Sequence, residues 1–155
     1  MNIFFLDENP YQAVQLLCDK HVVKMTLETA QLLCTRFRLN GVQSDSLYKP
    51  THIHHPCQLC LTNPDNFIWL VHYFKAILDE YTFRYHKIHK CTKIYDLFVK
   101  NLITNTYDKT KLTFPKCMPD EFKTDSVIDS YKNYYRFKRT IIHPFNYTNR
   151  QIPII

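Results

Sequence analysis

Asp19-Lys20-His21-Val22-Val23-Lys24-Met25-Thr26-Leu27-Glu28-Thr29-Ala30-Gln31 sets the fold, because its apolar residues recur at the spacing of a helix. These apolar residues cover most of the helix circumference, so we predict that this helix is largely buried. They continue past residue 31, and the full set is Val22, Val23, Met25, Leu27, Ala30, Leu32 and Leu33. Asp19 is a candidate cap before the run, and Asn40-Gly41 is a stop signal after it. The sequence therefore predicts a helix from about Lys20 to Leu39.

Capping signals predict further helices on both sides of this segment. Each signal is a short polar residue, in two cases followed by proline, that precedes a run of apolar residues at helical spacing. The expected helices are Asn9-Pro10 to about Cys18, Asn63-Pro64-Asp65 to about Ile88, a short helix at 91–102, and Val127 to about Thr140 after Asp125 or Ser126.

The remaining segments are expected to be irregular. Residues 1–7 form a short strand or an extended arm, 43–63 form a loop rich in proline and histidine, 104–120 are turn-rich, and a proline-punctuated tail follows the last helix. No internal repeat or linker interrupts the chain. We predict an all-α fold: a compact single-domain helical bundle spanning 1–155, with a long proline/histidine loop and an extended C-terminal tail.

Composition narrows the classes of function. The chain has 155 residues and a single glycine, Gly41, which excludes the glycine-rich loops of P-loop and dinucleotide-binding enzymes. A net charge of +6 favours an anionic partner, and 15% aromatic residues offer stacking surfaces for bases. We therefore expect a nucleic acid as partner, DNA or possibly RNA, and no cofactor.

Six cysteines raise the question of disulfides, but no secretory signal precedes them. The apolar start at Met1–Leu6 meets Asp7-Glu8 too early for a signal core, and no apolar run approaches the roughly 18 residues of a membrane span. We expect reduced thiols in an intracellular monomer that is neither secreted nor bound to a membrane.

A polar stripe on the 20–39 helix holds the candidate catalytic residues. His21, Lys24, Glu28 and Gln31 fall on one face, beside apolar surface. Such a face is more often solvated, with Lys24 and Glu28 forming an ordinary pair worth about 0.3–0.5 kcal/mol. Because the stripe is narrow on so apolar a helix, we expect it to line a cleft.

The histidine and cysteine cluster is a rival signal. His52-Ile53-His54-His55-Pro56-Cys57-Gln58-Leu59-Cys60 contains a C-x₂-C pair beside histidines, a pattern that can bind zinc. A second pair at the usual separation is missing, so no metal site is predicted. His55 is instead a candidate contact to a substrate phosphate.

The C-terminal segment is the candidate nucleic-acid-binding region. From Ser130 to Ile155 there is no acidic residue, and basic and aromatic residues interleave. Cations there can neutralise phosphates and tyrosines can stack on bases; the candidates are Lys132, Tyr135, Arg136, Lys138 and Arg139. The alternative is that the tyrosines are core and the cations a solvated face.

Several of these blocks resemble known proteins. Residues 19–31, His55-Pro56-Cys57, Glu80–Tyr85, Met118–Glu121 and Tyr131–Tyr135 resemble a group of uncharacterised proteins of phages and large DNA viruses. That places the protein in the host cytoplasm or nucleus, or in the virion. More distantly, the chain is similar to the phage pyrimidine-dimer DNA glycosylases with AP-lyase activity, of the endonuclease V type. His21 and Glu28 keep the seven-residue separation of that family's histidine and catalytic glutamate.

The resemblance implies a mechanism. In that family an N-terminal α-amine attacks the sugar, so Glu28 would be the catalytic carboxylate and His21 a neighbour of the substrate. An α-amine has an ordinary pKa of about 7.7–8.0 and suits this attack. The family exposes a small second residue by removing methionine; here Asn2 is larger, so Met1 or Asn2 would carry the amine.

Two alternatives for the nucleophile stay open. Lys24 would supply the amine if burial favours its neutral form, or Glu28 would activate water. The substrate implied is a damaged or modified pyrimidine in DNA. Alternatives of other classes are a non-catalytic nucleic-acid-binding protein and an enzyme acting on RNA or a nucleotide.

Overall fold

Three short polar residues begin helices where the sequence predicts them. We describe residues 2–155 of the protein from a computed structural model. The side-chain oxygens of these three residues accept a backbone N–H of the first turn at 2.9, 2.8 and 3.1 Å, each typically worth about 1 kcal/mol. They are Asn9 before α1 (Pro10–Gln15), Asn63 before α4 (Pro64–Tyr85) and Ser126 before α6 (Val127–Ile141).

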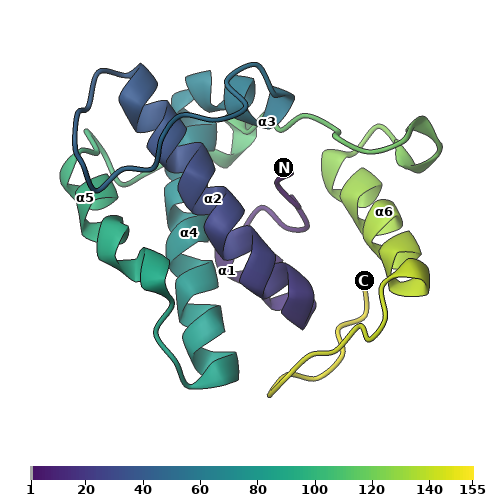
Figure 1. The fold of residues 1–155 in the computed structure, drawn as a ribbon. Helices are drawn as coiled ribbons and strands as arrows, with labels where there is room; N and C mark the ends of the chain where they lie inside the picture. The colour runs from purple at the N-terminus through teal and green to yellow at the C-terminus, as the bar shows by residue number, and fades with distance from the viewer. Residues whose placement is uncertain (1) are drawn as a thin grey trace.

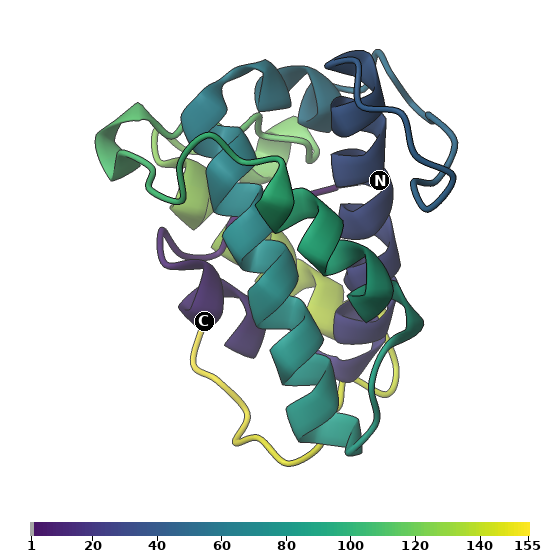
Figure 2. The ribbon, with the colours of Figure 1, turned by 90° about the vertical axis from the view of Figure 1, so that its left-hand side faces the viewer.

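Two long helices, α2 (Asp19–Leu39) and α4, form the centre of the molecule (Figure 1). α2 and α4 pack on each other, and α1 packs on α4, as Figure 2 shows from the side. Every regular element within residues 2–155 is helical, which confirms the predicted all-α class. No helix in that range combines the length and the apolar composition that a membrane span requires.

Short helical turns fill the segments between the long helices. The loop predicted at 43–63 contains α3 (Pro56–Leu59) and η1 (Cys60–Thr62), because His55 caps a turn that Pro56 begins. The helix expected at 91–102 is found as η2 (Lys90–Ile94) and α5 (Tyr95–Lys100), and two further turns follow, η3 (Lys109–Lys111) and η4 (Asp120–Phe122). The expected extension of α4 to Ile88 is wrong: the helix ends at Tyr85, where His86 takes a left-handed conformation with φ of 53°.

An extended N-terminal segment, residues 2–7, joins α6 to the rest of the core. Ile3, Phe4, Phe5 and Leu6 are buried, and the segment passes between α2 and α6 in Figure 1. The Phe5 ring packs on Trp69 of α4 at 5.0 Å. The Phe4 ring lies 4.7 Å from His21 of α2 and 5.3 Å from Tyr135 of α6. Of the two predicted forms, the extended arm is the correct one.

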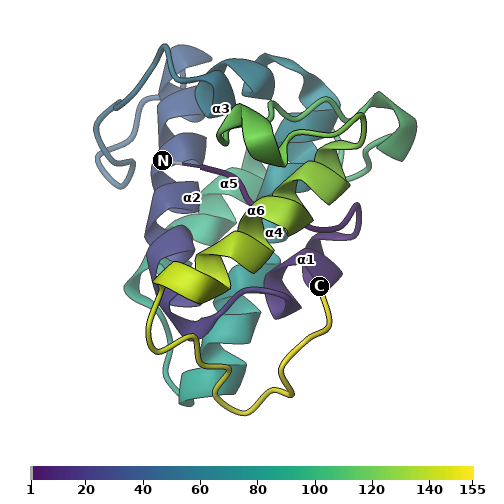
Figure 3. The same ribbon diagram turned by 90° about the vertical axis from the view of Figure 1, so that its right-hand side faces the viewer.

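A buried ion-pair network anchors the C-terminal tail. Asp19 does not cap α2 as predicted; its carboxylate instead binds Arg84 of α4 at 3.0 Å and Thr148 of the tail. Glu80 binds Arg84 at 2.7 Å and Arg150 at 2.7 Å. The tail thereby returns along the molecule and ends beside α1 (Figures 2 and 3).

Candidate functional site

His21 lies where the N-terminal segment crosses α2. Its side chain is buried, its ring stacks on Phe4, and its Nδ1 lies 2.8 Å from the Tyr135 hydroxyl. Burial, together with the charges of Lys138 and Lys24, lowers the pKa of His21 to about 4. The imidazole is therefore neutral at pH 7.

Hydrogen bonding selects the tautomer of His21. The Tyr135 hydroxyl accepts the backbone N–H of Cys18 at 2.8 Å, which leaves its own proton for the Nδ1 of His21. Burial raises the pKa of Tyr135, so this phenol stays protonated. The histidine proton is then on Nε2, which makes no hydrogen bond within residues 2–155 and remains a donor.

Glu28 lies two turns further along α2, about 10 Å along the helix axis from His21. Its side chain is only 17% exposed, and Lys24 Nζ lies 3.5 Å away. The Lys24 side chain is 64% exposed. The expectation that burial favours a neutral Lys24 is therefore wrong, because this amine stays in water. Val23 and Leu27 are also exposed, so α2 is less buried than predicted.

Three segments meet around Asn2, at the start of the N-terminal segment. Asn2 Nδ2 donates to the Cys117 carbonyl at 2.9 Å, and its Oδ1 lies 2.9 Å from the hydroxyl of Tyr131. The Cys57 thiol approaches the same oxygen at 3.9 Å. α3, the loop before η4 and α6 thus hold Asn2 in place. Met1, the other residue predicted to carry the amine, lies outside the described residues.

His55 caps α3 through its Nδ1, which accepts the Cys57 N–H at 3.1 Å. Burial lowers the pKa of His55, while the charge of Glu28 acts in the opposite direction. The field of the Glu28 carboxylate therefore reaches this histidine. Within residues 2–155 no group of three or more His, Cys, Asp or Glu side chains is arranged to hold a metal ion.

The predicted cations of α6 divide into two kinds. Arg136 and Arg139 fold the tail back, donating to the carbonyls of Ile155 at 2.6 Å and Pro153 at 2.7 Å. Lys132 forms no ion pair within residues 2–155, and Lys138 Nζ lies 4.5 Å from the centre of the Tyr134 ring.

Two sequence inferences about this region need correction. Tyr135 is fully buried, and its hydroxyl is engaged with Cys18 and His21, so in this structure it is a core residue with no face for a nucleic acid. Arg150 lacks a nearby acid in sequence, yet Glu80 binds it with both carboxylate oxygens. The sequence of α6 and the tail alone suggests that both residues bind nucleic acid at the surface, because their actual partners come from other parts of the chain.

Tyr73 of α4 escaped sequence reasoning. It is fully buried in the core. Its hydroxyl, however, has no hydrogen-bond partner within residues 2–155. Burial, with a smaller effect of the Glu28 charge, raises its pKa. An unpaired buried hydroxyl near the carboxylate is a group that water or a ligand ordinarily satisfies.

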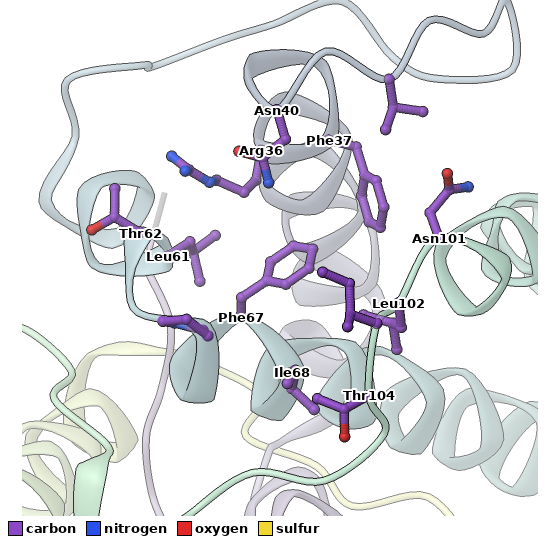
Figure 4. Close-up of a pocket in the computed structure, with 13 residues that line it drawn as sticks. Arg36, Phe37, Asn40, Leu61, Thr62, Phe67, Ile68, Asn101, Leu102 and Thr104 are labelled. Carbon is purple, nitrogen blue, oxygen red and sulfur yellow. The ribbon is translucent and has the colours of Figure 1, made fainter.

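A sizeable cavity lies away from these groups. About 500 Å³ in volume, it opens at the C-terminal end of α2, where Phe37 and Phe67 face it with Arg36 at its edge (Figure 4). None of the predicted catalytic or nucleic-acid-binding residues lines it. We locate the candidate site by its chemistry, on the part of α2 that carries His21 and Glu28 and that the N-terminal segment contacts at His21.

We compared the chain with known proteins. No curated protein and no solved structure matches the chain. A family model described as pyrimidine dimer DNA glycosylase matches residues 1–93, more than half of the chain. The matched range includes Asn2, His21, Glu28 and His55, and it ends before α6. The distant resemblance inferred from the sequence is confirmed: the chain belongs to the pyrimidine dimer DNA glycosylase family.

Proposed function

We propose that this protein is a DNA glycosylase that removes a damaged or modified pyrimidine, with Glu28 as the catalytic carboxylate. One observation carries the proposal. The family match covers the N-terminal segment and α2, which meet where Phe4 stacks on His21, and α2 also carries the half-buried Glu28. The match supports a glycosylase; the residue roles below are our proposal.

Cleaving the bond between a base and its sugar develops positive charge on the sugar. A carboxylate in a partly desolvated position stabilises that charge more strongly than one in bulk water. Glu28 has this position, with 17% of its side chain exposed. It is thus placed to stabilise the sugar cation or to take a proton from the attacking group.

His21 acts as a positioning residue in this proposal. It is only 7% exposed, which leaves little of the ring for contact with DNA. Its ring instead fixes Phe4 by stacking and Tyr135 by a hydrogen bond. Because the imidazole is neutral, this contact does not change through the physiological pH range.

The nucleophile is an amine or water. In the amine route, the nitrogen bonds to the sugar C1′ as the bond from C1′ to the base breaks. The nitrogen then loses a proton and the C1′–O4′ bond opens as O4′ takes a proton, which leaves an imine that permits strand cleavage. In the water route, Glu28 takes the proton of the attacking water. Within residues 2–155, Lys24 carries the amine nearest to Glu28, but this side chain is exposed and its amine is therefore not desolvated. An α-amine remains the other candidate.

Lysines that make no ion pair with the tail are the proposed contacts to DNA phosphates. Lys132 and Lys138 of α6 are half-buried, while Lys24 of α2, near Glu28, is exposed. Arg136 and Arg139 are assigned instead to the tail, because their donors bind its carbonyls. DNA binding should therefore depend on salt mainly through the lysines.

The test uses duplexes that contain a UV-induced pyrimidine dimer or an abasic site, incubated with and without borohydride. Wild-type protein should release the damaged base, and Glu28→Gln should not. The matched control is Glu121→Gln, which makes the same change at an exposed position of η4.

Trapping distinguishes the nucleophiles, since borohydride reduces an imine to a stable adduct. Loss of the adduct in Lys24→Ala identifies Lys24, and its loss after blocking the α-amine identifies that group. Base release without an adduct identifies water. Tight salt-dependent binding with neither release nor trapping on any DNA would overturn the proposal in favour of a binding module, and release from RNA or nucleotides alone would overturn it in favour of an enzyme of that class.

A further inference from the structure

Two thiols far apart in sequence meet beside Asn2. The Sγ of Cys57 in α3 lies 3.6 Å from the Sγ of Cys117 in the loop before η4. The Cys57 thiol is fully buried and Cys117 is half-buried. Solvent species thus reach the pair from the Cys117 side.

We infer that Cys57 and Cys117 form a reversible disulfide when the protein meets a peroxide, and that this bond releases Asn2 from its present contacts. The consequence for catalysis rests on the proposed function, since the N-terminal segment, which packs on His21 of α2, is part of that site. The disulfide itself does not depend on it.

Cys117 is the thiol that reacts first. The Cys57 thiol donates a hydrogen bond to the Cys117 sulfur, and together with Tyr131 and Lys123 this outweighs burial and lowers the pKa of Cys117 to about 7. The same contact, together with burial, raises the pKa of Cys57. A partly exposed thiolate beside a protonated thiol is the usual arrangement of a reactive cysteine and its resolving partner.

The reaction balances with one peroxide for each bond. The Cys117 thiolate attacks hydrogen peroxide, the O–O bond breaks, and a sulfenic acid and a hydroxide form. The hydroxide takes up the proton that Cys117 released on ionising and becomes one water. The Cys57 sulfur then attacks the Cys117 sulfur, and the S–O bond breaks. The departing hydroxide takes the thiol proton of Cys57 as a second water. Two thiols are oxidised and one peroxide is reduced.

Cys60 is the nearest competitor for this partnership. Its thiol donates to the Cys57 carbonyl at 3.3 Å, and burial raises its pKa to about 12. It is therefore a poor nucleophile at neutral pH. Cys60 serves as the control cysteine in the same region.

Bond formation acts on Asn2 through both cysteines. The sulfur atoms must approach from 3.6 Å to about 2.05 Å. Because Cys57 is buried in α3, we expect the shift to fall mainly on Cys117, whose carbonyl accepts the Asn2 Nδ2 bond. Cys57, whose sulfur lies 3.9 Å from the Asn2 Oδ1, also loses its only thiol proton and with it the ability to donate to this oxygen. Oxidation thus removes or displaces contacts at both ends of the Asn2 amide.

The bond is tested by treating reduced, full-length protein with one equivalent of hydrogen peroxide. Intact mass should show the loss of two hydrogens, peptide mapping should give a Cys57–Cys117 cross-link, and dithiothreitol should reverse both. Because the cross-link closes a long loop, the melting temperature should rise by several degrees. Cys57→Ser and Cys117→Ser should each prevent the cross-link, and Cys60→Ser should retain it. Pairing of other cysteines, or over-oxidation without a cross-link, would overturn the inference.

Two readouts test the effect on Asn2. The NMR signal of its side-chain amide should shift on oxidation of wild-type protein and stay fixed in Cys117→Ser; an unmoved signal despite the cross-link would overturn the release of Asn2. Base release should fall by up to about 100-fold on oxidation and recover with dithiothreitol, as for a displaced group at a reacting centre. Reduced protein without base release on any substrate would contradict the proposed function alone, because mass and NMR still read the disulfide.

Discussion

Replacing Tyr135 with phenylalanine removes one oxygen atom from the contact between α2, α6 and the N-terminal segment. The hydroxyl accepts the backbone N–H of Cys18 and donates to His21 Nδ1, both at 2.8 Å, and Cys18 is fully buried. An orphaned buried donor costs about 1–3 kcal/mol, and the bond lost to His21 adds about 1 kcal/mol. We expect Tyr135→Phe to lower the free energy of unfolding by about 3 kcal/mol.

Urea unfolding measures this loss. With a slope of about 2 kcal/mol/M, the midpoint should fall by about 1.5 M without a change of slope. Tyr134→Phe is the matched control, since its hydroxyl makes no hydrogen bond within residues 2–155, and it should change stability by less than about 0.5 kcal/mol. Equal, small losses in both variants would refute the role assigned to the Tyr135 hydroxyl.

Three further predictions concern acid stability, the buried ion pairs and DNA binding. Because His21 has a pKa of about 4 when folded and an ordinary value near 6.5 when unfolded, the unfolded chain binds its proton first. The free energy of unfolding should therefore fall by about 3 kcal/mol as the pH drops from 6.5 to 4, and a His21→Asn variant that fell equally would contradict this. Arg84→Met leaves two carboxylates without their buried partner and should cost about 3–5 kcal/mol in chemical denaturation; a cost below about 1 kcal/mol would show that the network is not stabilising. Lys132→Ala and Lys138→Ala should each lower the slope of log binding constant against log salt by about 0.9, whereas Lys100→Ala on α5 should not, and three unchanged slopes would exclude α6 as the DNA contact.

Local signals predicted the helices because caps and apolar spacing act over a few residues. Asn9, Asn63 and Ser126 begin helices as expected, and the left-handed Gly41, with φ of 90°, follows the end of α2. Asp19 fits the same capping pattern, but Arg84 binds its carboxylate from 65 residues away. A distant partner overrode a local preference there.

The sequence alone names the residues of the candidate site, but it says much less about the groups that surround them. His21 and Glu28 were found from their spacing, yet the burial of His21 depends on Phe4, which the N-terminal segment brings from outside the helix. The basic tail looked free because its partners, Glu80 and the backbone carbonyls, are distant or carry no sequence signal. The Cys57–Cys117 contact likewise joins segments 60 residues apart.

Single-turnover release of the damaged base by Glu28→Gln, with Glu121→Gln alongside and DNA affinity measured for both, tests the assignment of Glu28. If this carboxylate acts at the reacting sugar, Glu28→Gln should slow release by about 10²–10⁴-fold with unchanged affinity for the duplex. Glu121→Gln should match the wild type. Release by Glu28→Gln at a rate close to wild type would contradict the role of Glu28 in catalysis.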